Sequence, residues 1–232
     1  GSAYTLMVFL ISVLLGLSIG SGTVFSLHYG AGNSSALRRS IFVSFVLIGA
    51  VTFLLNVAAF VWLDPILRLL QVPQDIYGMM RSYLWIIFCG IVFTFIYNFY
   101  ASLLRAVGDS VTPLWFLAVS VVLNIALDLF FILQLDWGIQ GAAAATVLAQ
   151  GVAALGIIIY TYRRRPELRW HHEDMCFDRT CLKEIASFST LTCIQQSVMN
   201  LGILMVQGLV NSFGTAVMAA FAAAVKIDSF AY

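Results

Sequence analysis

Apolar runs of about 20 residues, the length that spans the hydrocarbon core of a bilayer as a helix, recur along the chain. Six runs are complete and a seventh is partial: Tyr4–Leu27, Ser40–Leu63, Ser82–Leu104, Pro113–Leu135, Gly141–Tyr162, Leu182–Asn211, and Ala216 to the end. The 232 residues are 61% hydrophobic and only 10% charged, against roughly 25% charged in soluble domains. Because irregular backbone is not tolerated against lipid, we expect each run to be helical. The sequence therefore predicts an all-α, polytopic membrane protein, with the lipid bilayer as its main partner.

Lys and Arg are distributed unevenly among the predicted connections. The first, third and fifth connections hold nine of the twelve Lys and Arg residues, whereas Arg68 and Arg81 are alone in the second, fourth and sixth. The positive-inside rule then predicts that the odd connections are cytoplasmic, in an inner (plasma) membrane. The chain would begin outside, without a signal sequence, so we expect it to be a fragment that follows an upstream helix. A net charge of +1 without an extended basic patch does not indicate nucleic-acid binding.

Polar residues inside the fourth apolar run lie at helical spacing. Ser120, Asn124 and Asp128 are each four residues apart, so they share one helical face. A carboxylate in hydrocarbon costs about 2.5–3.5 kcal/mol on insertion scales. Burial disfavours its charged form, so we expect Asp128 either to take up a proton or to bind a small cation such as Na⁺. No other metal or cofactor is indicated, and catalytic residues are not expected.

Thr146 lies in the next run at a compatible depth, since a short connection around Gly138 makes the two helices antiparallel neighbours. Its hydroxyl would complete an oxygen cluster with Asp128 and Asn124. Such a cluster links the arrival of a cation to a change of local charge, which an ion-coupled device requires. The alternative is an Asp that only bridges helices through hydrogen bonds.

Uncharged polar side chains form a second stripe in the sixth run, and Asn98 interrupts a cluster of aromatic residues in the third. Gln196, Asn200 and Gln207 fall on one helical face and predict either a cavity lining or contacts between helices. Ser120 and Asn98 are further candidates for lining a cavity. Small residues at Gly16 and Gly20 form a GxxxG pattern, which favours close approach of two helix backbones in lipid.

Two connections stand out in composition. Residues 63–75, LDPILRLLQVPQD, carry turn signals. Residues 163–181 form the one long charged connection, which we interpret as a solvated cytoplasmic loop between two lobes. Its His and Cys residues match no common closed zinc spacing, so a zinc site remains a minor alternative.

The motifs together resemble the multidrug and toxic compound extrusion (MATE) transporters of the wider flippase superfamily. The matching segments are YGAGN (29–33), LLRAVGDSVTPL (103–114), LNIALD (123–128), GIQGAAAATVLAQG (138–151) and LGILMVQGLVNSFGTAVMAA (201–220). The resemblance implies twelve helices in two lobes, of which this chain would span the second to the start of the eighth. It assigns residues 1–162 to an amino-terminal lobe lacking its first helix, 163–181 to the inter-lobe loop and 182–232 to the start of the carboxy-terminal lobe.

The same resemblance implies a function and a site. Asn124, Asp128 and Thr146 match the family's amino-lobe cation site, whose further acidic ligand lies on the first helix. We expect a monomeric antiporter that exchanges H⁺ or Na⁺ for organic cations or amphipathic compounds by alternating access. A flippase for lipid-linked saccharides is the nearest alternative, although the complete runs lack the interior Lys and Arg that would hold a pyrophosphate. An intramembrane enzyme would need His or Glu clusters at membrane depth, and the sequence has none there.

Overall fold

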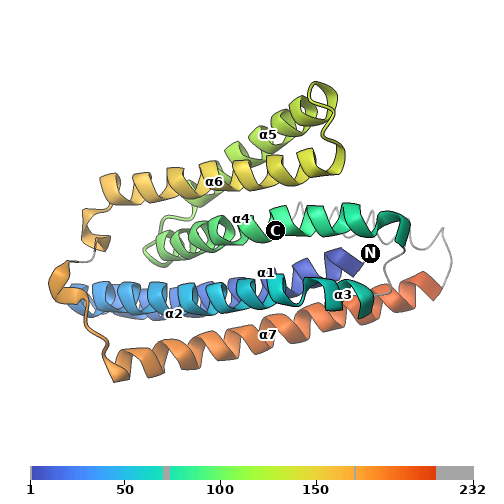
Figure 1. The fold of residues 1–232 in the computed structure, drawn as a ribbon. Helices are drawn as coiled ribbons and strands as arrows, with labels where there is room; N and C mark the ends of the chain where they lie inside the picture. Colours follow the sequence, from blue (N-terminus) through green and yellow to red (C-terminus); the bar gives the residue numbers. More distant parts are fainter. Residues whose placement is uncertain (1, 70–73, 170, 213–232) are drawn as a thin grey trace.

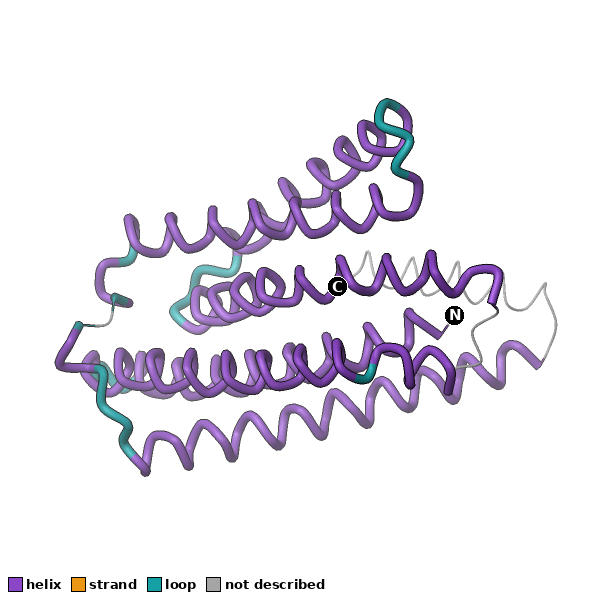
Figure 2. Tube along the Cα trace, in the orientation of Figure 1, coloured by secondary structure: helices purple, strands orange, loops and turns teal. Residues whose placement is uncertain are grey.

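The computed structural model describes residues 2–69, 74–169 and 171–212, and within these residues every regular element is a helix (Figure 2). The elements are α1 (Ser2–Gly30), α2 (Ser34–Val61), α3 (Leu63–Leu69), α4 (Gln74–Ala106), α5 (Val111–Leu133), α6 (Gly138–Arg164), two short 3-10 turns η1 (Pro166–Leu168) and η2 (His172–Asp174), and α7 (Arg179–Ser212). The predicted all-α class is confirmed. The partial seventh run, with Lys226 and Asp228, lies outside the described residues.

Five of these helices, α1, α2, α4, α5 and α6, are long and apolar enough to cross a membrane. The sixth predicted run is also a long helix, α7, with 34 residues, but it is not among those five. The difference follows from its composition, because Gln195, Gln196 and Asn200 lower the hydropathy of its middle. Several helices extend beyond their apolar runs. For example, α4 begins at Gln74 rather than at Ser82.

The helices pack as a bundle in which α4 contacts α1, α2, α5 and α6 (Figure 1). The α5–α6 hairpin lies on one side of α4, and α1, α2 and α7 lie on the other (Figure 1). The largest buried cluster fills the space between α1, α2 and α4, where Phe25 meets Phe99 edge-on at a centroid distance of 5.9 Å. Burial of such aromatic side chains contributes a large part of the apolar packing within the bundle.

The α1–α7 contact is closely packed because α1 has glycines where the two backbones meet. A Cβ at Gly16 would lie 2.7 Å from the Cα of Cys193, and one at Gly20 would lie 2.5 Å from the Cα of Ser189. The Ser189 hydroxyl donates to the carbonyl oxygen of Leu17 at 3.3 Å. The GxxxG prediction of close backbone approach is therefore confirmed, with α7 as the partner helix.

The connections differ in part from what the sequence predicted. In the first connection Asn33 caps α2, since its side chain accepts a hydrogen bond from the backbone N–H of Ala36 at 3.1 Å. The second connection, predicted as a loop, contains α3, because Leu63 and Leu67 can be buried against α4. Asp64 of α3 is paired with Arg81 of α4 at 2.9 Å.

Most described residues of the long charged connection are exposed, as expected of a solvated loop, but some of them are buried. Leu168 is buried in the main core, and the side chain of Asp174 is only 7% exposed. Asp174 pairs with Arg38 of α2 at 2.8 Å and accepts a hydrogen bond from the backbone N–H of His171 at 3.0 Å. Burial alone would raise the pKa of Asp174, but these partners outweigh it and hold the pKa below its usual value. This ion pair thus holds the connection against the N-terminal part of α2.

Candidate cation site and cavities

The face of α5 that carries Ser120, Asn124 and Asp128 is turned toward the bundle. Ser120 is buried, whereas Asn124 and Asp128 are half-buried. The other faces of α5 carry large apolar side chains such as Trp115 and Leu133, which are 70% and 71% exposed, as a lipid-facing surface would be. The predicted polar face therefore exists, and it lies against α6.

Asn124 and Thr146 meet between α5 and α6. The side-chain amide of Asn124 donates to the hydroxyl oxygen of Thr146 at 3.3 Å. The Thr146 hydroxyl in turn donates to the carbonyl oxygen of Ala142, one turn earlier on α6, at 3.0 Å. The tight connection between the two helices brings the residues together, with Asp136 at φ 55° and Gly138 at φ 54°. The Thr146 hydroxyl therefore donates a hydrogen bond within α6 and accepts one from α5.

Asp128 lies one helical turn beyond Asn124 on the same face, about 9 Å past the midpoint of α5. Its Oδ1 atom is buried and has no hydrogen-bond partner among the described residues. A buried carboxylate oxygen without a partner is costly, so it calls for a proton or a cation. Carboxylate, amide and hydroxyl oxygens are also the ligand types that a hard cation prefers. These oxygen types fit a proton or Na⁺, and the structure brings Asn124 and Thr146 into contact, whereas the joining of Asp128 to them stays a prediction.

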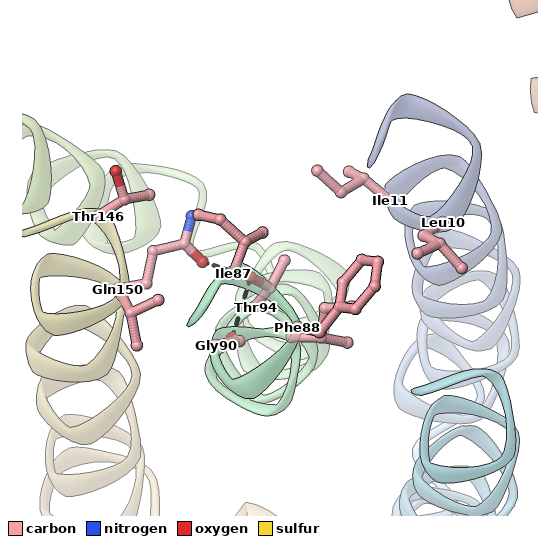
Figure 3. Close-up of a pocket in the computed structure, with 10 residues that line it drawn as sticks. Leu10, Ile11, Ile87, Phe88, Gly90, Thr94, Thr146 and Gln150 are labelled. Atoms are coloured by element: carbon pink, nitrogen blue, oxygen red, sulfur yellow. Dashed lines mark hydrogen bonds between the residues drawn. The ribbon is translucent and has the colours of Figure 1, made fainter. Parts of the chain in front are cut away.

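Two cavities lie between α1, α4 and α6, beside this cluster. A cavity of about 60 Å³ is lined by Thr146 and otherwise mainly by apolar side chains of α1 and α4 (Figure 3). A second cavity, of about 220 Å³, extends to α5 and includes two of the predicted lining residues, Asn98 and Ser120. Among the described residues, neither lining contains a charged one.

Thr94 and Gln150 line both cavities, although neither residue was predicted to do so. The Thr94 hydroxyl donates to the side-chain oxygen of Gln150 at 2.5 Å, as the dashed line in Figure 3 marks. The spacing could have found them, because Gln150 lies four residues after Thr146 and Thr94 four before Asn98. Asn98 donates to the Thr94 carbonyl oxygen at 2.8 Å.

The stripe predicted on α7 lies elsewhere. The Asn200 amide donates to the hydroxyl of Ser12 on α1, so this residue joins two helices, and Gln196 is half-buried near it in sequence. The side chain of Gln207 lies outside those that the structure describes. The stripe is therefore not brought together with Asp128, Asn124 and Thr146.

The fold and the polar groups inside it define a polytopic helical membrane protein with a candidate cation site and neighbouring cavities. The chain belongs to the MatE family, whose model matches residues 1–130. This confirms the resemblance seen in the sequence. Because a curated relative at 32% identity is named a multidrug resistance protein, membership argues against the intramembrane enzyme.

Individual relatives agree with this assignment. The chain is 32% identical over 97% of its length to "Probable multidrug resistance protein YpnP" of Bacillus subtilis (strain 168), and covers 50% of that protein. The structure superposes with a TM-score of 0.86 on the outward-facing conformation of a multidrug resistance MATE family transporter, at 21% identity, covering 98% of this chain and 51% of the other. For an inward-facing conformation the TM-score is 0.81, at 21% identity, with coverage of 97% and 52%. The chain thus spans about half the length of the relatives it matches.

Proposed function

We propose that the protein containing this chain is a cation-coupled efflux antiporter, in which H⁺ or Na⁺ binding at Asp128 drives export of an organic compound by alternating access. The unpartnered, buried Oδ1 of Asp128 is the observation that carries the proposal. It is supported by membership of the MatE family and by the multidrug resistance names of the curated relatives. Asn124 and Thr146 supply the neighbouring amide and hydroxyl groups.

The cavities support an organic substrate without dense negative charge. Their linings combine apolar side chains with uncharged amides and hydroxyls, which suit a cationic or amphipathic molecule. A saccharide flippase of the same superfamily would have to hold a pyrophosphate, for which Arg or Lys is the usual partner. The absence of such residues from these two linings favours drug-like substrates over lipid-linked saccharides. We propose a monomer as the working unit.

The orientation in the membrane is also a proposal. The first, third and fifth connections lie at one end of the bundle, on the left in Figure 1. Arg38, Arg39 and Arg165 lie at this end, and the ion pairs of Arg38 and Arg39 reach the long connection. By the positive-inside rule, this end faces the cytoplasm of an inner (plasma) membrane.

An efflux assay on the full-length protein tests the function. Everted membrane vesicles would be energised and the uptake of a fluorescent cationic dye compared for wild type, Asp128→Asn and Asp136→Asn. Asp136 is the matched control, because it lies in the α5–α6 connection, where Asn also tolerates its positive φ. We expect Asp128→Asn to lose transport and Asp136→Asn to keep it. Wild-type transport by Asp128→Asn would reject the proposal, and transport of a lipid-linked saccharide instead of the dye would favour the flippase.

A further inference from the structure

Helix α6 carries polar contacts to both of its neighbours on successive turns. Thr146 accepts from Asn124 of α5, and Gln150, four residues later, accepts from Thr94 of α4. The two α6 residues are about 6 Å apart along the axis, on one side of the helix. The candidate cation site and the cavity wall are therefore joined through one turn of α6.

The packing at this turn is tight on the α4 side. A Cβ at Gly90 would lie 2.6 Å from a methyl group of Val147, so α4 and α6 are in close contact between the two polar pairs. A shift of α6 at Thr146 cannot be absorbed here by loose packing, because closely packed interiors have low compressibility and transmit strain. Such a shift would change the geometry between Gln150 and Thr94.

A cation arriving at Asp128 would compete with the present hydrogen bond between Asn124 and Thr146. Asn124 directs its N–H group at Thr146, and that bond occupies a lone pair of the hydroxyl. A cation held jointly by Asp128 and these neighbours would draw on the amide oxygen of Asn124 and on one of the two lone pairs of the Thr146 hydroxyl. A protonated Asp128 would compete as a new donor for the same acceptors. In either case a new interaction competes with the Asn124–Thr146 contact when the cation arrives.

On these grounds, and resting on the proposed antiport, we propose that Gln150 and Thr94 are a positioning pair that transmits cation binding to the substrate cavities. The pair borders both cavities, together with Ile11 of α1, and Figure 3 shows Gln150 reaching across toward Thr94. The smaller cavity includes Thr146, and the larger one includes Asn98 and Ser120. Breaking the pair on cation arrival changes the wall that both cavities share, and so lowers their affinity for the substrate.

The test is the dependence of substrate affinity on the coupling cation in the full-length protein. The Michaelis constant (KM) for a fluorescent cationic dye would be measured in proteoliposomes at low and high H⁺, and at low and high Na⁺. For wild type we expect the KM to rise by about fivefold or more with the coupling cation, a typical coupling between two sites. Gln150→Met and Thr94→Val should each flatten this dependence to below about twofold. Thr94→Ser, which keeps the hydroxyl, should restore it.

Gln140→Met is the matched control, since Gln140 is exposed on the first turn of α6 and should leave the dependence unchanged. Size-exclusion profiles would identify a misfolded variant. If one of Gln150→Met and Thr94→Val is misfolded, the cation dependence of the other variant tests the proposal. A wild-type cation dependence in Gln150→Met or Thr94→Val would overturn the positioning role. If Asp128→Asn is inactive at the same time, the antiport proposal survives that result, whereas normal coupling in Asp128→Asn would reject the antiport itself.

Discussion

The side-chain amide of Asn124 on α5 donates to the hydroxyl of Thr146 on α6 at 3.3 Å, one turn before Asp128. Contacts of this kind between membrane helices contribute about 0.6 kcal/mol on average. We therefore expect Thr146→Val to lower the free energy of unfolding by less than about 1 kcal/mol. If the hydroxyl serves the cation, the same change should reduce efflux by about tenfold or more. Thr146→Ser should transport normally, and equal losses of stability and transport would point to a structural role alone.

The close packing of α1 on α7 makes Gly20 intolerant of any side chain. A Cβ there would lie 2.5 Å from the Cα of Ser189, which is backbone and cannot move aside alone. We expect Gly20→Ala to lower the free energy of unfolding by about 1–3 kcal/mol, as overpacking does. Gly78→Ala on α4 is the control, because a Cβ there meets open space and the helix gains propensity. Thermal unfolding in detergent measures both, and equal stability of the two variants would contradict the packing.

The Asp174–Arg38 pair should make stability depend on pH. Because the pKa of Asp174 is lower when folded than when unfolded, the pair stabilises the protein above pH ~4. This contribution is lost as the pH falls through the lowered pKa of the folded state. Asp174→Asn should therefore lower the unfolding temperature at pH 7 by an amount equivalent to about 1–2 kcal/mol, and by progressively less in acid.

Asp178→Asn is the control for that measurement. Asp178 pairs with Arg39 at 3.5 Å, but both side chains are about two-fifths exposed, so the pair should contribute little. A difference between wild type and Asp174→Asn that stays constant from neutral pH into acid would argue against the ion pair as the cause.

The exposed thiol of Cys176 reports the orientation of the long connection. We expect a membrane-impermeant maleimide to label the full-length protein in everted vesicles and not in right-side-out vesicles, with Cys176→Ser abolishing that signal. The reverse pattern would place the basic end of the bundle outside the cell and contradict the positive-inside assignment.

The sequence predicted the helices and the Asn124–Thr146 contact for the same physical reason. Apolar length fixes which segments can span a bilayer, and a short connection forces α5 and α6 to be antiparallel neighbours, which brings their polar residues to a common depth. Backbone approach at Gly16 and Gly20 was equally predictable, although the identity of the partner helix was not. Spacing within one segment carries no information on which distant segment packs against it.

The features that the sequence did not predict depend on contacts between residues that lie far apart in the chain. Thr94 and Gln150 lie at helical spacing from Asn98 and Thr146, but only the α4–α6 packing makes them partners of each other. The charged composition of residues 163–181 indicated a solvated loop. It could not predict the burial of Asp174, because that burial depends on Arg38, which is 136 residues away in sequence. Asn200 was as consistent with a cavity as with a helix contact until its partner Ser12 was known.

The proposal that Asp128 receives the coupling cation is tested most directly by counting cations released when substrate binds. Purified full-length protein in detergent would be mixed with a cationic dye substrate, while a pH indicator or a Na⁺-sensitive electrode records the release. We expect cation release by wild type and by Asp136→Asn, and none by Asp128→Asn. Undiminished release by Asp128→Asn would show that the cation binds elsewhere and would rule out Asp128 as its site.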